Sequence, residues 1–310
     1  MMKKIAVIDC GSNSFRMLIA SLSSQHFDVI KREYQMVMLG KSLSSNEGII
    51  DDESFKRGIK TLVSFRKVMD KYNCEGYHCI GTSAMRTATN ANKFIEASKE
   101  LANIEIEIIS EQDEARYSFF GALETTDDKN QFAVLDIGGG SSEVIYFDKG
   151  RLISHSMLLG AARLKNMFWS KKLTPSEDEF EMAVKYVLEE IKKERISFLN
   201  KSLIGVAGTI TTLASIEKQL VEYRPQYINN TILSLKNIKS MLLYIMRLDE
   251  EKRNSVPGMF PPERANNIIA GMIILMEMMK ALDFDEIKVK STCILEGLIL
   301  IKYFSNSIDK

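Results

Sequence analysis

The chain has 310 residues, and its 41 lysines and arginines are balanced by 41 aspartates and glutamates. This neutrality excludes a broadly cationic nucleic-acid coat and a polyacidic disordered chain, but not a local cationic cleft. A hydrophobic fraction of 45% is ordinary for a globular protein, and the length predicts about two domains. The four cysteines form no C-x-x-C pair, so we expect neither a zinc ribbon nor a disulfide framework, and a reducing cytoplasm as the location.

The first part of the chain alternates strand and helix patterns. Apolar runs at 5–9 and 15–20 flank a polar turn, which predicts strand, turn, strand. Periodicity and turn residues then predict, in order, one or two strands in 27–39, a helix over 51–72, a strand over 77–81, a polar loop over 82–92, a helix ending at 101, a strand over 104–108 and a helix over 111–124.

The opening pattern returns after a polar break at 125–131. Residues 132–141 align with residues 5–14 at an offset of 127, sharing Ala, Val, Asp, Gly and Ser at matching places. We interpret this as an internal repeat of two similarly built domains. The predicted division is 1–124 and 125–310, with a terminal helix over 294–310 that packs back on the first domain.

The second part continues the alternation, which predicts an α/β fold. The expected elements are a helix over 174–199 opened by a capping box at Thr174–Glu177, a strand over 203–207, a helix over 208–220, a helix capped by Ser234 that runs to 248, a long apolar helix over 263–282, a strand over 286–290 and a last helix from 294. The most apolar run, 268–276, is too short to span a bilayer, so we expect no membrane partner. Its methionines are predicted to fill an apolar helix interface.

Two glycine-containing turns each follow a strand-terminal aspartate. Glycine lets backbone N–H groups approach an anion closely, and neighbouring hydroxyls add donors. Either turn alone is better explained as a simple hairpin, but two matching turns favour phosphate binding. The candidate phosphate-binding residues are Gly11, Ser12, Asn13, Ser14, Gly138, Gly139, Gly140, Ser141 and Ser142.

Three carboxylates lie beside these turns, namely Asp9, Asp136 and Glu143. Mg²⁺ in proteins takes one or two carboxylates together with water and phosphate oxygens, so they are candidate metal ligands. The alternative for the two aspartates is capping of loop N–H groups, and for Glu143 it is a solvated strand face.

Other polar residues carry weaker signals. Gly208 and Thr209 open a helix whose N-terminus can attract phosphate, although Thr209 could be no more than an N-cap. Arg86 could form a bidentate pair with phosphate or be a surface arginine. The acids at 111, 113 and 114 are, by themselves, best explained by a favourable interaction with the helix dipole.

Taken together, these motifs resemble the exopolyphosphatase/guanosine pentaphosphate phosphohydrolase (Ppx/GppA) family of the actin-like ATPase superfamily, in its short two-domain form. The resemblance rests on segments spread along nearly the whole chain: Ile8–Ser14, Gly81–Arg86, Glu114–Arg116, Asp136–Glu143, Gly205–Ala214 and Arg264–Gly271. It implies two actin-like (ribonuclease H-like) lobes with a cleft between them.

The resemblance also implies residue roles. Glu114 matches the glutamate that activates the attacking water, and Arg86 matches an arginine that contacts the phosphate chain. Asp9, Asp136 and Glu143 match acids near the metal. Arg264, with Arg163 as a further candidate, would help to make the cleft positive. Family members release terminal phosphate from inorganic polyphosphate, or the 5′-γ-phosphate from guanosine pentaphosphate, with Mg²⁺, and Mn²⁺ is an alternative.

The chain departs from the family pattern at two places. Leu295 stands where the family usually has arginine, and Asn229-Asn230 stand where it has His-Gly, which leaves substrate preference open. Two alternatives therefore stay beside the hydrolase: an actin-like sugar or acid kinase, and a non-catalytic regulator that senses guanosine penta- or tetraphosphate. We expect no nucleic-acid polymer as partner, and a homodimer is an open alternative.

Overall fold

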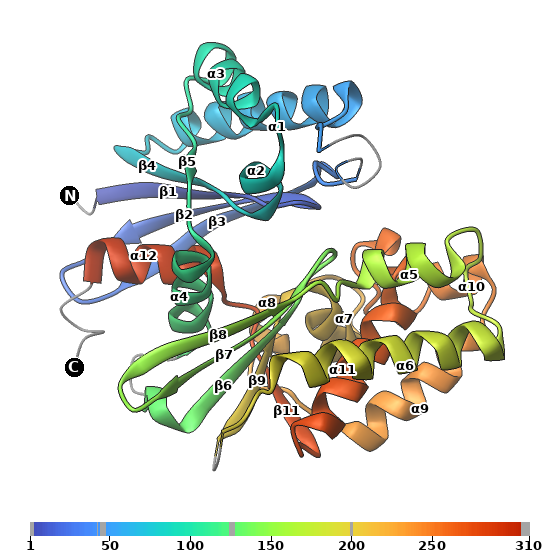
Figure 1. The fold of residues 1–310 in the computed structure, drawn as a ribbon. Coiled ribbons are helices and arrows are strands. Elements are labelled where there is room, and N and C mark those ends of the chain that lie inside the picture. The colour runs from blue at the N-terminus through green and yellow to red at the C-terminus, as the bar shows by residue number, and fades with distance from the viewer. Residues whose placement is uncertain (1–2, 42, 44–47, 124–127, 199–200, 305–310) are drawn as a thin grey trace. The chain divides into compact units, whose positions relative to one another are not determined.

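The computed structural model describes residues 3–41, 43, 48–123, 128–198 and 201–304 (Figure 1). The chain divides into two compact units, Met1–Gly121 with Ile294–Lys310, and Ala122–Cys293. The boundary predicted between residues 124 and 125 lies outside the described residues, so the domain division 1–124 and 125–310 stays a prediction. The last helix belongs to the first unit.

The first unit contains a five-stranded sheet in the order β3-β2-β1-β4-β5. Its strands are β1 Lys3–Cys10, β2 Ser14–Leu22, β3 Phe27–Met36, β4 Gly76–Gly81 and β5 Glu107–Ile108. The first three strands form an antiparallel meander, and β4 and β5 run parallel to β1. The apolar run Ile5–Ile8 is completely buried, because β1 is the central strand and both of its faces are covered.

The helices of the first unit are α1 Asp52–Lys71, α2 Ser83–Thr87, α3 Ala91–Ala102, α4 Glu111–Ala122 and α12 Ile294–Phe304. Helices α1 and α3 lie side by side over one face of the sheet, whose core includes Phe15, Leu62 and Phe94 (Figure 1). Helix α12 packs on β1 and α4; a Cβ at Gly297 would lie 1.8 Å from the Tyr117 carbonyl oxygen, so only glycine fits there.

Two predictions for this unit need correction. The segment 82–92 is not all loop, because Ala84 and Met85 are buried against the sheet and draw the chain into the short helix α2. The strand predicted over 104–108 has ladder pairing only at Glu107–Ile108. Ile104 and Ile106 are buried, as the alternation predicted, whereas Ile108, the third apolar residue of the alternation, is 40% exposed.

The second unit contains a six-stranded sheet in the order β10-β11-β9-β6-β7-β8. Its strands are β6 Phe132–Ile137, β7 Ser142–Asp148, β8 Arg151–Met157, β9 Ser202–Val206, β10 Ile232–Ser234 and β11 Glu286–Val289. The series β8-β7-β6-β9-β11 repeats the order and the directions of β3-β2-β1-β4-β5. The repeat seen in the sequence is therefore a repeat of topology, with β10 added at one edge.

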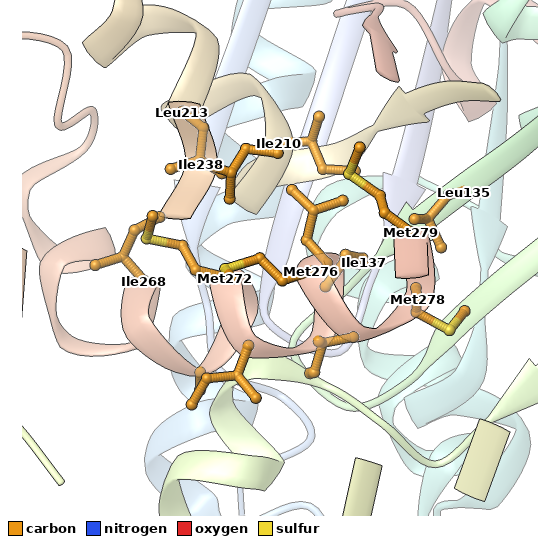
Figure 2. Packing of buried hydrophobic residues seen from close by; sticks show 14 of the residues in the cluster. Leu135, Ile137, Ile210, Leu213, Ile238, Ile268, Met272, Met276, Met278 and Met279 are labelled. Carbon is orange, nitrogen blue, oxygen red and sulfur yellow. The ribbon is translucent and has the colours of Figure 1, made fainter. Parts of the chain in front are cut away.

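The second unit is rich in helices: α5 Ala161–Trp169, α6 Glu177–Glu194, α7 Ala207–Glu217, α8 Pro225–Ile228, α9 Leu235–Met246, α10 Glu250–Asn254 and α11 Ile268–Ala281. Helix α11 is buried along nearly its whole length between the sheet and its neighbours. Figure 2 shows its side chains packed against residues of β6, α7 and α9. Met272, Met276, Met278 and Met279 fill this interface, which confirms the prediction for the methionines.

Helix boundaries in this unit differ from the prediction in two ways. The capping box of α6 is Ser176 with Glu179, not Thr174 with Glu177; the Ser176 N–H donates to Glu179 Oε2 at 2.7 Å. The apolar helix begins at Ile268 rather than 263, because a 3₁₀ turn over Pro262–Asn266 follows the two prolines. Among the described residues, no helix is long and apolar enough to cross a bilayer.

Candidate functional site

The first polar turn is closed by a hydrogen bond from the Gly11 N–H to the Ser14 carbonyl at 3.1 Å. The Ser12 carbonyl accepts from the Gly40 N–H at 2.8 Å, and the Asn13 carbonyl accepts from the N–H groups of residues 37 and 38. The carbonyl oxygens are thereby directed to the segment that follows β3. The turn is held in one conformation by its neighbours, which is what a preformed anion nest requires.

Asp9 lies at the end of β1, directly across from Arg16 on β2. The Arg16 Nε and Nη2 both donate to Asp9 Oδ2, at 3.0 and 2.6 Å. Asp9 is 2% exposed, and its Oδ1 is buried without a hydrogen-bond partner among the described residues. A buried carboxylate oxygen without a hydrogen-bond partner could accept a hydrogen bond or bind a cation.

The residue after Asp9, Cys10, belongs to the hydrophobic core. Burial raises the pKa of its thiol well above the usual value, so the thiol stays protonated and unreactive.

Two predicted residues of the first unit are in direct contact. Arg86 Nη1, at the end of α2, donates to Glu114 Oε2 at 2.7 Å and to the Ile109 carbonyl at 3.1 Å. The Glu114 side chain is 31% exposed, whereas that of Glu111 is 73% exposed and 3.8 Å from Arg86. Asp113 accepts from the Ser110 hydroxyl at 2.7 Å. Each of the three acids at the start of α4 thus has a different environment.

The second turn reproduces the first. The Gly138 N–H donates to the Ser141 carbonyl at 3.0 Å. This hydrogen bond corresponds to the one between Gly11 and Ser14 in the first unit. The carbonyls of Gly138 and Gly139 accept N–H groups from the first residues of α5. A Cβ placed on Gly140 would meet nothing within 4 Å, so there is open space on that side of the turn.

Ser142 lies deeper than a ligand-binding side chain would. It is completely buried, and its hydroxyl donates to the Leu159 carbonyl. Its side chain therefore joins β7 to the segment before α5. The hydroxyl of Ser142 is thus engaged within the second unit, and phosphate binding by this residue stays a prediction.

Asp136 and Glu143 face each other across β6 and β7, in the register that Asp9 and Arg16 have in the first unit. Directly opposed side chains have Cβ atoms about 5 Å apart, so the two carboxylates are neighbours. Asp136 Oδ2 lies 3.7 Å from Cys293 Sγ, and Glu143 Oε1 accepts from the Ser156 hydroxyl at 3.1 Å. Adjacent acids of this kind suit a divalent cation.

The described residues contain no group of three His, Cys, Asp or Glu side chains arranged to hold a metal ion. Asp9 belongs to the first unit, and Asp136 and Glu143 belong to the second. The second unit therefore provides an adjacent pair of acids, Asp136 and Glu143. The first unit provides one carboxylate oxygen, Asp9 Oδ1, that has no hydrogen-bond partner among the described residues. Water and phosphate oxygens are the usual further ligands of Mg²⁺.

Helix α7 begins next to this pair, because β9 runs parallel to β6. Gly208, in its first turn, is covered by Arg264; a Cβ there would lie 1.7 Å from Arg264 Nη1. The Arg264 Nε is buried without a partner among the described residues. Thr209 is 4% exposed and packs on Gly271 of α11, so its side chain is part of a helix contact and its N–H remains for an anion.

Two residues of the site were missed by sequence reasoning. Arg16 has a detectable signal, since it occupies the position of Glu143 in the internal repeat. Cys293 has none, because its contact with Asp136 joins residues 157 apart in the chain.

A protein-family model described as the Ppx/GppA phosphatase family matches residues 18–304. The chain belongs to this family. The first sheet and the second are accordingly the two lobes of the actin-like ATPase fold, as predicted from the sequence.

Curated relatives agree with this assignment. The chain is 33% identical over 309 residues to a bifunctional 3-dehydroquinate synthase/phosphatase of Fusobacterium nucleatum, covering 95% of this chain and 46% of that protein. It thus spans about half the length of this relative. It is 25% identical to a putative exopolyphosphatase of Haemophilus influenzae, covering 96% of this chain and 90% of that one. A guanosine-5′-triphosphate,3′-diphosphate pyrophosphatase of Photobacterium profundum is 26% identical, with coverages of 95% and 58%.

Solved structures give the same result. The Ppx/GppA enzyme of Aquifex aeolicus matches with a TM-score of 0.81 and 25% identity, covering 97% of this chain and 99% of that one. An exopolyphosphatase from Cytophaga hutchinsonii matches with a TM-score of 0.84 and 26% identity, covering 98% of each chain.

Proposed function

We propose that this phosphatase hydrolyses a terminal phosphoanhydride, releasing phosphate from inorganic polyphosphate or the 5′-γ-phosphate from guanosine pentaphosphate. The observation that carries the proposal is the contact between Arg86 and Glu114, which sets a half-buried carboxylate beside a cation in a chain that holds two phosphate-type turns. Relatives named exopolyphosphatase and guanosine-5′-triphosphate,3′-diphosphate pyrophosphatase support this substrate class.

In this proposal the turns and the α7 N-terminus bind the phosphate chain. Backbone N–H groups of Ser12–Ser14 and Gly139–Ser141 donate to phosphate oxygens, whereas those of Gly11 and Gly138 close the turns, and the space beside Gly140 leaves room for the phosphate. Arg264 lies against Gly208, and its buried Nε has no hydrogen-bond partner among the described residues. It therefore adds a positive charge at the N-terminus of α7, where the helix dipole already favours an anion.

Glu114 acts as the general base. Its carboxylate orients a water and accepts a proton as the water oxygen bonds to the terminal phosphorus and the bridging P–O bond breaks. Arg86 holds the carboxylate in place and attracts the phosphoryl oxygens. The leaving phosphate chain retains the electron pair of the broken bond.

The residues present fit a divalent cation. Asp136 and Glu143 form an adjacent pair, and the buried Oδ1 of Asp9 awaits a partner. In the second unit Asp136 and Glu143 would hold Mg²⁺ or Mn²⁺, which when bound would neutralise charge on the phosphoryl and leaving oxygens, and Asp9 is the candidate ligand of the first unit. None of the four cysteines forms a disulfide, which supports a reducing, cytoplasmic setting for the reaction.

The test is phosphate release by the purified chain from polyphosphate and from guanosine pentaphosphate, each with Mg²⁺ and with excess chelator. We expect metal-dependent release from at least one of them. Release from neither substrate would overturn the proposal. ATP consumption that requires an added sugar or organic acid would assign the chain to the kinases instead.

A further inference from the structure

We propose that Arg16 is a positioning residue of the first polar turn, Gly11–Ser14. It offsets the negative charge of Asp9, so that the turn can bind a phosphate group without a metal ion. The choice of ligand rests on the proposed function, in which this turn is a phosphate site. Arg16, Asp9 and the turn all belong to the first unit.

The carboxylate of Asp9 lies directly beside this turn. A Cβ placed on Gly11 would be 3.8 and 3.9 Å from the two carboxylate oxygens, Oδ2 and Oδ1. The Asp9 side chain is only 3% exposed, so water and salt screen its charge weakly. An uncompensated negative charge at this place would repel a phosphate group that approaches the backbone N–H groups of the turn.

Arg16 is placed to remove this repulsion. It lies directly across from Asp9 on β2, and its Nε and Nη2 donate to Asp9 Oδ2 at 3.0 and 2.6 Å. The Arg16 side chain is 36% exposed, whereas the carboxylate is buried. An anion that arrives from solvent therefore meets the positive member of the pair more readily than the negative one.

The same contact fixes the orientation of the carboxylate. Two donors of one rigid, planar guanidinium hold Oδ2, which restricts rotation of the acid. Oδ1 stays beside Gly11, buried and without a hydrogen-bond partner among the described residues. Arg16 therefore leaves this oxygen available to a donor or a cation that arrives with the phosphate.

The second turn has a different charge balance. At the position that corresponds to Arg16, Glu143 lies opposite Asp136. In the proposed function a divalent cation offsets these two acids, whereas the first turn has a cation of its own in Arg16. We therefore expect the two turns to differ in their need for metal, with the first one able to bind phosphate in the presence of a chelator.

The experiment is titration calorimetry of the full chain with tripolyphosphate in excess chelator. Wild type should bind, and Arg16→Met should bind about 10- to 100-fold more weakly, because it leaves the charge of Asp9 without its partner. Arg16→Lys keeps the positive charge and should retain most of the affinity. The double variant Asp9→Asn/Arg16→Met removes both charges together, so we expect it to recover an affinity close to that of wild type.

The matched control is Arg32→Met, on the neighbouring strand β3. It also removes a cation that is paired with a buried acid, Glu296, and it should bind tripolyphosphate like wild type. Melting temperatures without ligand show whether each variant folds. Arg16→Gln, whose amide can still donate to Asp9, replaces the Met substitution in the single and the double variant if the Met protein does not fold.

Each outcome decides between the two proposals. Wild-type affinity in Arg16→Met, or no binding by wild type in chelator, overturns the role of Arg16 even when wild type hydrolyses polyphosphate with Mg²⁺. A double variant that stays weak would show that Arg16 does not act by offsetting Asp9, and equal weakening by Arg32→Met would show a general charge effect; both results overturn the role. If the double variant recovers binding but wild type releases no phosphate from either substrate, the hydrolase proposal fails and the role of Arg16 stands.

Discussion

At the scale of single residues, the start of α4 shows that the surroundings of an acid, rather than its chemistry, make it suitable as a general base. Glu111, Asp113 and Glu114 have the same chemistry and lie within one helical turn. Asp113 receives the Ser110 hydroxyl, Glu111 is mostly solvated, and only Glu114 is joined to Arg86 by a short contact. A carboxylate that is half-buried and held by a cation is oriented in advance, which a general base requires.

We predict that Glu114→Gln lowers the turnover number by about 10²- to 10⁴-fold, because the amide keeps the shape of the side chain and loses its basicity. Tripolyphosphate binding should largely survive. Steady-state kinetics and calorimetry measure the two quantities, and Glu111→Gln is the control that should stay active. Near-normal turnover in Glu114→Gln would remove this residue from the mechanism.

Arg253 has a structural role, in contrast to the role that we propose for Arg86. Its side chain is completely buried, and its guanidinium donates to the carbonyls of Leu173 and Ile245 at 2.8 and 3.1 Å and to the Thr174 hydroxyl at 2.6 Å. Burial lowers the pKa of Arg253 from its ordinary value. Its role is to satisfy the end of α9 and the loop before α6.

We therefore predict that Arg253→Met destabilises the protein by about 3 kcal/mol, because it leaves several buried acceptors without a donor. Urea unfolding of the variant measures this loss. Lys252→Met is the adjacent control; its exposed ion pair with Asp249 is worth at most about 1 kcal/mol. A loss no larger than that of the control would show that the arginine is replaceable.

At the scale of elements, helix α12 is attached to the first sheet by polar contacts as well as by packing. His78 Nε2 of β4 lies 3.1 Å from the Tyr303 hydroxyl, and Arg32 of β3 pairs with Glu296. Burial lowers the pKa of His78 below its ordinary value of 6.5. The folded form therefore binds this proton less readily than the unfolded form.

The sign of the pH effect follows. The contribution of His78 is fully present above pH 6.5 and is lost as the pH falls below that value, because the unfolded chain then takes up the proton more readily. We predict a fall in melting temperature between about pH 7 and 5 that is smaller in His78→Gln, whose amide does not titrate in that range. An identical fall in both proteins would contradict this.

The sequence predicted most elements correctly because their apolar periodicity is strong, as in α1, or because their apolar run is long, as in α11. The misses have specific causes. Helix α2 is short and polar at its ends, so its helicity depends on burial of Ala84 and Met85, which no local pattern reveals. The start of α11 differs from the predicted one because the 3₁₀ turn over Pro262–Asn266 precedes the helix, and a sequence pattern does not separate such a turn from a first helical turn.

The candidate site was predictable to a similar extent. The two turns and their aspartates follow from a repeat that is visible in the sequence. The pairing of Asp9 with Arg16, the burial of the Ser142 hydroxyl and the approach of Cys293 to Asp136 depend on strand register and on long-range contacts. Those features need the fold itself.

At the scale of the whole molecule, two sheets of like topology differ at one corresponding position. Opposite the strand-terminal aspartate, the first unit has Arg16 and the second has Glu143. A guanidinium neutralises its aspartate, whereas a second carboxylate adds negative charge. This difference supports the metal site that we propose at Asp136 and Glu143 of the second unit.

We predict that Glu143→Gln raises the Mg²⁺ concentration needed for half-maximal phosphate release, because it removes one hard oxygen ligand with its charge. Direct Mn²⁺ titration should show weaker binding in the same variant. Glu33→Gln, an acid of β3 in the first unit, serves as the control. Unchanged metal dependence in Glu143→Gln would remove this residue from the metal site.

The last helix has a consequence for how the protein is made. Residues 122–293, the whole second unit, are inserted between the strands of the first unit and the helix α12 that packs on them. During synthesis the ribosome thus releases a complete second unit before the first has its final helix. The second unit can close its core as soon as it has emerged, whereas the first sheet lacks the helix that covers it and Arg32 lacks its partner Glu296 until residues 294–304 leave the ribosome.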